Sequence, residues 1–171
     1  MLTDLTLMDM DYICLHMRER DKQEIFGLRP HNSPIRLSWE AYHYIINHGR
    51  GKIAWHREKP AAFAAFTEQW PGVWDVWMAG TEDFEAACVP LLRWFRKEAN
   101  DILTVCNGHR LQCDSRADYE RAHKLIETFG GKRECVFRKF GKDGADYIRF
   151  VWYNGENDAV LKPGFGRKQE D

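Results

Sequence analysis

The stretch from Val73 to Asn100 most constrains the fold, because it reads in succession as a strand, a turn and a long helix. Residues Val73–Met78 are mostly β-branched or aromatic, which is typical of a packed strand that Ala79-Gly80 then ends. Apolar residues recur at helical spacing from Phe84 onward. Pro90 interrupts this pattern, so we expect either a kinked helix or a helix that begins near Pro90.

The turn after this strand lies where many α/β proteins bind phosphate, because free amides and the helix dipole favour anions there. Thr81 is expected to be the N-cap of the helix. The first turn carries Glu82, Asp83 and Glu85, and Gly80 is its one glycine. Carboxylates favour the same amides and repel a diphosphate, so we expect no phosphate cradle at this turn.

Composition narrows the class of protein. The chain has 171 residues, of which 44% are apolar, and this predicts one domain with a sizeable core. With 25 basic and 26 acidic residues the net charge is −1, which gives no electrostatic argument for nucleic acid or an anionic membrane as a partner. No apolar run is long enough to span a bilayer, and Asp4 and Asp9 argue against a signal peptide. The five scattered cysteines are expected to be reduced thiols.

The remaining segments predict helices around a largely antiparallel sheet. In the N-terminal half we expect a strand at Leu2–Leu7, a helix at Asp9–Leu28 broken near Glu19–Asp21, a helix from its N-cap Ser38 to Asn47, and strands at Lys52–His56 and Ala61–Thr67 joined near Lys59-Pro60. In the C-terminal half we expect a strand at Arg110–Cys113, a helix capped by Asp114 or Ser115 that runs to Phe129, and a hairpin of Glu134–Phe140 with Tyr147–Trp152.

Residues that carry chemistry in other proteins have structural interpretations here. The seven histidines lack metal-ligand spacing, and we expect no metal site. Cys113 lies at a strand end but is expected to be a buried thiol. Trp74 and Trp77 should point to opposite faces of their strand, because side chains alternate along it. The charged run of Arg18–Lys22 is typical of a solvated helix face.

Several stretches resemble one protein family. Residues 77–84 (WMAGTEDF), 122–131 (AHKLIETFGG), 140–147 (FGKDGADY), 150–152 (FVW) and 17–25 (MRERDKQEI) resemble the internal virion protein A-like proteins of short-tailed bacteriophages, which are described as acetyltransferase-like. The order of elements resembles the fold of GCN5-related N-acetyltransferases (GNAT). The resemblance covers about residues 9–152. It implies an α/β (α+β) fold with a mixed, mostly antiparallel central sheet flanked by helices, over residues 1–153, followed by a tail at 154–171.

The sequence departs from the GNAT pattern at two places. GNAT enzymes carry Q/R-x-x-G-x-G/A after the central strand, whose amides bind the diphosphate of CoA, whereas residues 78–83 (MAGTED) contain one glycine and two acids. GNAT enzymes also tend to have an Asn at the start of the next-to-last helix and a Tyr near its end as general acid. Tyr119 and Ile126 occupy those positions, and isoleucine cannot donate a proton.

The resemblance and its departures imply a virion-associated protein, made in the host cytoplasm, that acts through protein–protein interaction with other phage virion proteins. Its acetyltransferase activity would be lost, with no catalytic residue and no cofactor. The helix faces around Arg18–Lys22 and the tail at Asn154–Asp171 are contact candidates. The oligomeric state stays open.

The alternative is an active acetyl-CoA-dependent N-acyltransferase that modifies a host or phage protein. The groove would then lie between the Val73 and Arg110 strands. The backbone around Met78, Gly80 and Thr81 would bind the pantetheine arm, and Arg116 or Arg121 would bind phosphate. The general base would be one of Asp114, Ser115 and Glu68.

Overall fold

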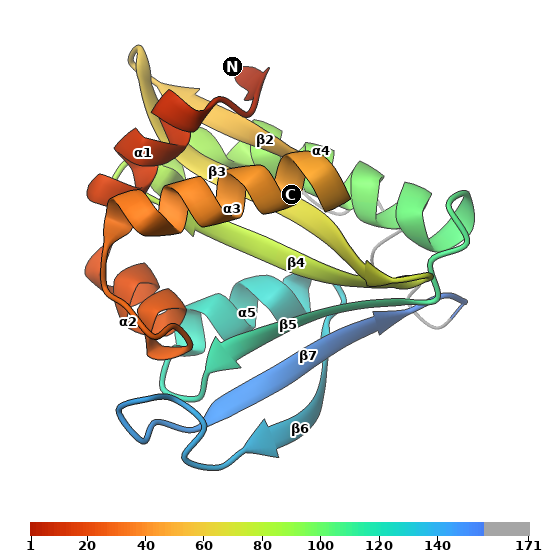
Figure 1. The fold of residues 1–171 in the computed structure, drawn as a ribbon. Coiled ribbons are helices and arrows are strands. Elements are labelled where there is room, and N and C mark those ends of the chain that lie inside the picture. The colour runs from red at the N-terminus through yellow and green to blue at the C-terminus, as the bar shows by residue number, and fades with distance from the viewer. Residues whose placement is uncertain (156–171) are drawn as a thin grey trace, which may run out of the picture.

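A seven-stranded sheet with the strand order β1-β2-β3-β4-β5-β7-β6 runs through the centre of the molecule (Figure 1). The computed structural model describes residues 1–155. The strands are β1 (Leu2–Asp4), β2 (Gly49–His56), β3 (Lys59–Trp70), β4 (Val73–Gly80), β5 (Arg110–Arg116), β6 (Lys132–Phe137) and β7 (Tyr147–Tyr153). The helices are α1 (Leu7–Leu15), α2 (Glu19–Gly27), α3 (Pro34–His48), α4 (Phe84–Thr104) and α5 (Glu120–Thr128). The sheet is mixed and mostly antiparallel, as the sequence predicts, because β4 and β5 are its one parallel pair among the described residues.

The parallel pair is open at one end. β4 and β5 are joined only between Val73–Asp75 and Arg110–Gln112, at the start of each strand. Beyond these residues the two strands separate, and α2 and α5 lie at the open end (Figure 1). The backbone of one half of β4 is therefore left without a strand partner on the β5 side.

Two cores cover the two faces of the sheet. Side chains alternate along β3, so that Ala64 and Phe66 pack with α4 while Phe63 and Ala65 pack with α1 and α3. The predicted split of the two tryptophans on β4 is confirmed, because Trp74 belongs to the α4 core and Trp77 packs against the other one. Figure 1 shows the same layering, with α1 and α3 on one side and α4 on the other.

Several predicted helix starts are wrong by a few residues. The third helix begins at Pro34, and Ser33 is its N-cap, since the Ser33 side chain accepts a hydrogen bond from the Arg36 amide. The Ser-Pro pair suits this role because proline at the first helical position needs no amide partner. Ser38 is instead buried inside the helix, where its hydroxyl donates to the Ile35 carbonyl.

The strand–helix junction also differs from the prediction. β4 includes Ala79 and ends at Gly80, so the predicted end of the strand holds, but the helix cap differs. Asp83 is the N-cap position of α4, and the hydroxyl of Thr81 accepts a hydrogen bond from the Asp83 amide. α4 runs without interruption past Pro90, so the alternative helix start near Pro90 is wrong. Packing of this helix against the sheet outweighs the one hydrogen bond that proline removes.

In the C-terminal half, β5 extends through the predicted cap residues Asp114 and Ser115 to Arg116, and α5 begins only at Glu120. Full pairing of β5 with β7 explains the longer strand. The predicted hairpin is confirmed as β6 and β7. Most of the predicted tail at 154–171 lies outside the described residues.

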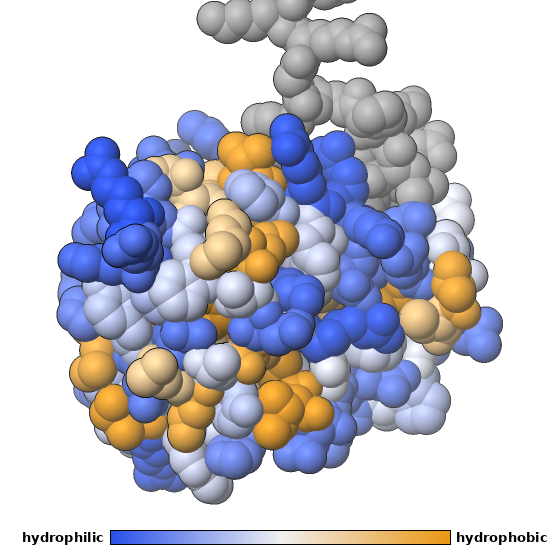
Figure 2. Space-filling view, turned by 90° about the horizontal axis from the view of Figure 1, so that it is seen from above, coloured by the Kyte–Doolittle hydropathy of each residue, from blue (hydrophilic) through white to orange (hydrophobic). Residues whose placement is uncertain are grey.

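The described surface offers no obvious apolar interface on the face seen in Figure 2. Hydrophobic side chains there form small groups separated by hydrophilic residues (Figure 2). Among residues 1–155, none of the helices has the length and apolar content needed to cross a membrane.

Candidate functional site: the gap between β4 and β5

A cavity of about 1110 Å³ occupies the gap where β4 and β5 separate. Its walls come from β4 (Asp75–Met78), from β5 (Gln112–Ser115), and from side chains of α2, α4 and α5. A concave site of this size, at a break in the sheet, is where ligands bind in many α/β proteins.

The backbone of β4 faces this cavity. The amide and the carbonyl of Gly80 both point away from β3, because they pair with the Asp21 carboxylate and the Arg18 amide. The hydrogen-bonding direction of the backbone alternates along a strand with a period of two. The amide and carbonyl groups of Met78 and Val76 therefore point the same way as those of Gly80. They are placed to form strand-like hydrogen bonds with an extended ligand.

Four amides of the turn between β4 and α4 already have hydrogen-bond acceptors within the chain. The Gly80 amide donates to Asp21 Oδ2 at 2.9 Å, and the Thr81 amide donates to the Ala61 carbonyl at 2.8 Å. The Asp83 amide donates to Thr81 Oγ1 at 3.2 Å, and the Phe84 amide to the Thr81 carbonyl at 3.0 Å. A phosphate bound to these four amides would have to displace hydrogen bonds that they make within the chain.

Gly80 is required here by packing. A Cβ atom at this position would lie 2.6 Å from Cδ2 of Phe84 and 3.0 Å from the carbonyl oxygen of Ala61. Close packing of the first residue of α4 on the end of β4 therefore explains the one glycine of the turn.

The carboxylate of Asp21 ties three elements together at this end of the cavity. It accepts hydrogen bonds from the Gly80 amide, from the Tyr119 hydroxyl at 3.1 Å, and from the Arg18 guanidinium at 2.9–3.2 Å. The same guanidinium lies over the Phe84 ring, 4.3 Å from its centroid. The anion bound at this turn is therefore the Asp21 carboxylate, a side chain of α2.

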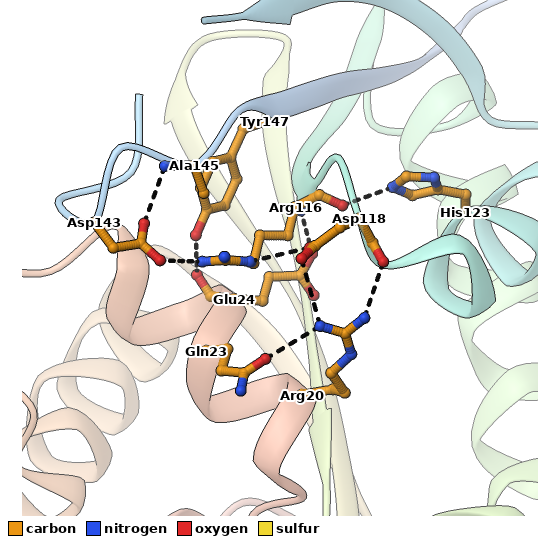
Figure 3. Close-up of polar contacts among 9 residues, drawn as sticks. All are labelled: Arg20, Gln23, Glu24, Arg116, Asp118, His123, Asp143, Ala145 and Tyr147. Atoms are coloured by element: carbon orange, nitrogen blue, oxygen red, sulfur yellow. Dashed lines mark hydrogen bonds and ion pairs between the residues drawn. The ribbon is translucent and has the colours of Figure 1, made fainter. Parts of the chain in front are cut away.

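Glu24 is the second carboxylate that α2 places in the cavity wall (Figure 3). Its Oε1 accepts a hydrogen bond from the Arg116 amide at 2.9 Å, and its carbonyl accepts one from the Tyr147 hydroxyl. The Arg116 guanidinium pairs with Asp118 and Asp143 (Figure 3). Burial raises the pKa of Glu24 to about 7, against the opposing effect of the hydrogen bonds around it.

Two further carboxylates line the same cavity from the strands. Asp114 forms a two-fold ion pair with Arg149, with both N···O distances at 2.7 Å. Asp75 accepts a hydrogen bond from the Gln112 amide group, and burial raises the pKa of Asp75.

Burial, reinforced by Glu24, Asp114 and Asp75, raises the pKa of the Cys113 thiol well above its usual range. Cys113 is therefore a protonated thiol at neutral pH and a poor nucleophile.

The wall formed by α4 and α5 is mostly basic. It carries Arg93, Arg96, Arg121 and Lys124 against one acid, Glu85, which is ion-paired with Arg121. Arg96 lies over the Phe129 ring. The cavity thus has a basic wall built from two helices. The opposite side carries four acids, Asp21, Glu24, Asp75 and Asp114, together with Arg18, Arg29 and Arg149.

The structure separates the predicted site residues. Of the four proposed for CoA, Met78 lines the cavity, Gly80 and Thr81 form the self-bonded turn, and Arg116 is engaged with Asp118 and Asp143. Among the proposed bases, Asp114 and Ser115 line the cavity, whereas Glu68 accepts a hydrogen bond from the Gly72 amide outside it. Ile126, which the sequence spacing aligns with the general-acid Tyr of GNAT enzymes, lines the cavity.

Sequence reasoning missed the residues of α2. Arg18 and Asp21 were expected on a solvated face, but Asp21 is buried and Arg18 is mostly so. Their spacing was the available signal, since positions 18, 21, 24 and 28 lie on the helix face that also carries the apolar Ile25. No three His, Cys, Asp or Glu side chains are grouped as metal ligands within residues 1–155.

Solved structures with the same fold include acetyltransferases. Neither a protein-family model nor a curated protein matches the sequence. Spermidine N-acetyltransferase from Vibrio cholerae, solved with CoA and spermine, has a TM-score of 0.69 at 15% identity, and the alignment covers 95% of this chain and 98% of that one. An N-acetyltransferase from Staphylococcus aureus has a TM-score of 0.69 at 16% identity, with 90% and 97% covered. Ribosomal-protein-alanine N-acetyltransferase from Brucella melitensis has a TM-score of 0.68 at 11% identity, with 90% and 99% covered. The chain therefore has the GNAT fold, as the sequence predicts.

Proposed function

We propose that this chain is a GNAT-fold protein that acts through protein–protein interaction and does not transfer acetyl groups. A shared fold does not carry a shared chemistry, so the proposal depends on the site. The observation that carries it is the occupied turn, where the Asp21 carboxylate accepts the Gly80 amide and is itself held by Arg18 and Tyr119.

The chemistry around the cavity supports the same conclusion. A diphosphate at the start of α4 would lie near the carboxylates of Asp21, Glu82 and Asp83, and like charges repel. At the position of the GNAT general acid, Ile126 has no proton to give.

Calorimetric titration with acetyl-CoA tests the proposal. We expect no heat of binding from the purified protein at millimolar ligand. A dissociation constant in the micromolar range, or about −8 kcal/mol of binding free energy, would overturn it. The variant Asp21→Ala frees the Gly80 amide and removes one negative charge, so it should bind CoA more tightly than the wild-type protein does. The variant Glu19→Ala removes an exposed carboxylate from the same helix and serves as the matched control.

The resemblance to internal virion proteins of phages supplies the kind of partner. Under the proposal the chain is packaged with other virion proteins, and mass spectrometry of purified particles of the source phage should detect it. Its absence from complete particles would count against a structural role there.

A second candidate function is N-acyl transfer, and the polarity of the cavity favours it. The basic wall, with Arg93, Arg121 and Lys124, suits a phosphate-bearing acyl donor, and Glu24 with a pKa of about 7 suits a general base. Turnover of acetyl-CoA with host lysate proteins as acceptors, lost in Glu24→Gln and retained in Glu19→Gln, would establish this function. No turnover would remove its main support.

A further inference from the structure

We infer that the guanidinium of Arg29 is a binding site for the carboxylate of a ligand that enters the cavity at the C-terminal end of α2. Arg29 follows Leu28, the C-cap of α2, and both residues line the cavity together with Phe63 and Trp77. The inference goes beyond the proposed function, because it names a ligand group for the end of α2 opposite to Asp21. It holds whether or not CoA binds.

Arg29 differs in its partners from the other two arginines on this side of the cavity. Arg18 pairs with Asp21, and Arg149 pairs with Asp114. Arg29 lines the same cavity but forms no ion pair with any residue that the structure describes. The cavity therefore contains one guanidinium without an acidic partner of its own.

The groups that act on Arg29 through space do not supply that partner. Glu40 is the carboxylate among them, and it is already paired with Arg36 at 2.6 Å and with His31 at 3.2 Å. The other group is Cys14, whose pKa burial raises to about 12, so this thiol is uncharged at neutral pH. The four acids of the cavity are not among the groups that act on Arg29.

The hydrogen-bond donors of Arg29 are also free. Its Nε is buried and makes no hydrogen bond. Its two terminal nitrogens likewise have no acceptor within residues 1–155, but they remain accessible. Buried side-chain donors in proteins nearly always have an acceptor, and a guanidinium offers five N–H groups in a fixed fork. An acceptor that comes from outside the chain would complete this site at the terminal nitrogens.

The surroundings hold the guanidinium in place before any ligand binds. It lies over the ring of Trp77, 5.1 Å from the centroid, and the indole of Trp77 is fixed by a hydrogen bond to Thr67. The Arg29 amide donates to the Phe26 carbonyl, and the Arg29 carbonyl accepts from Lys142 Nζ at 3.1 Å. Burial lowers the pKa of Arg29, and a charge in such a site attracts an anion more strongly than a fully hydrated one does. A preorganised group also loses little entropy on binding.

The chemistry of the site favours a carboxylate over a phosphate. Two parallel N–H groups of a guanidinium match the two oxygens of a carboxylate, and one negative charge balances the one free positive charge. Leu28, Phe63 and Trp77 around it suit an apolar or aromatic group next to the carboxylate. A phosphate dianion would leave excess negative charge in a cavity that already carries four acids.

The experiment uses two aromatic carboxylates, each with its neutral amide as the control probe. These are 3-phenylpropionate with 3-phenylpropionamide, and Nα-acetyl-phenylalanine with Nα-acetyl-phenylalaninamide. Binding to the full chain is followed by NMR at low salt, where the Arg29 guanidinium and the Trp77 indole N–H report the location of the probe. We expect each carboxylate to bind at least about tenfold more tightly than its amide, because only the carboxylate accepts charge-assisted hydrogen bonds.

The two carboxylates also distinguish the source of the ligand. Nα-acetyl-phenylalanine carries its carboxylate as the C-terminus of a peptide does, and 3-phenylpropionate carries it as a small organic acid does. Tighter binding of the first would support the inference with a protein C-terminus as the ligand. Tighter binding of the second would support it with a small carboxylic acid. Phenyl phosphate is the further probe, and tighter binding of phenyl phosphate than of both carboxylates would overturn the assignment.

Three variants make the result specific. Arg29→Gln removes the charge and should bind each acid no more tightly than its amide. Arg29→Lys keeps the charge without the fork and should bind the acids several-fold more weakly than the wild-type protein does. Arg20→Gln removes a half-exposed arginine of α2 that pairs with Asp118, and it should bind as the wild-type protein does.

Equal binding of acid and amide by the wild-type protein, or unchanged binding of the acids by Arg29→Gln, would overturn the inference. If Arg29→Gln does not fold, Arg29→Lys decides, and acid binding equal to that of the wild-type protein would overturn the role of the fork. None of these measurements uses CoA, so their outcome is independent of the calorimetric test of the proposed function.

Discussion

Asp21 is the single residue on which the arrangement of the site depends most. Asp21 is 4% exposed. Its carboxylate has hydrogen-bond partners in three parts of the chain: Gly80 of β4, Tyr119 just before α5, and Arg18 just before α2. The variant Asp21→Ala leaves an amide, a hydroxyl and a guanidinium without this partner. Loss of charged, buried hydrogen bonds should lower the free energy of unfolding by about 3 kcal/mol.

Urea denaturation measures this effect, with Glu19→Ala on the exposed face of the same helix as the control. The control should change stability by less than about 0.5 kcal/mol. If Asp21→Ala were as stable as the wild-type protein, the three bonds would be incidental to the fold.

Glu24 should make stability depend on pH. Its pKa is raised by burial from 4.5 to about 7, so the folded state holds this proton more tightly than the unfolded state does. The stabilisation is complete below about pH 4.5 and is lost as the pH rises through 7. Between these pH limits the free energy of unfolding of the wild-type protein should fall by about 2 kcal/mol relative to that of Glu24→Gln. This value allows for water in the cavity. Urea titrations of both proteins near pH 5 and near pH 8 measure this difference, which should be absent if Glu24 is ionised freely in the fold.

At the scale of elements, the junction of β4 and α4 fixes the open end of the cavity. Gly80 is in contact with Phe84, and the added Cβ of Gly80→Ala would overlap its ring. Overpacking of this kind costs about 1–3 kcal/mol, and we expect that loss of stability in thermal or urea unfolding.

A double-mutant cycle isolates the cause. In a Phe84→Ala background the ring is gone, so Gly80→Ala should cost clearly less than it does alone. Equal costs in both backgrounds would place the strain in the backbone of the turn, beside the Ala61 carbonyl.

At the scale of the whole molecule, small residues in the middle of the sheet set the distance between the layers. Ala62 and Ala64 of β3 are fully buried and face the α4 core. Leucine at position 64 would push α4 away from the sheet, and we expect Ala64→Leu to lower the free energy of unfolding by about 2 kcal/mol. The variant Ile46→Ala, at a half-exposed position of α3, should change it by less than about 0.5 kcal/mol. Similar values for the two variants in urea unfolding would mean that the layers tolerate added volume.

Sequence patterns predicted the fold well and the site only in part. Alternation on β4 correctly placed Trp74 and Trp77, and hairpin signals gave β6 and β7. Helix starts were less certain, because Ser33 and Ser38 are equally good caps by residue type and only packing decides between them. The occupied turn was predicted for the wrong reason: its own acids were expected to fill it, whereas Glu85 pairs with Arg121 and Asp21 takes the amide.

The sequence alone determined the class of fold and the absence of a glycine-rich turn, because periodicity and turn residues are local properties. The tertiary structure decided which charges matter. Asp21 is 59 residues from Gly80 and Tyr119 is 98 residues from Asp21, and sheet topology alone brings them together. Charges that are far apart along the chain come to share one site only after folding, and the burial of Glu24 in that site raises its pKa to about 7.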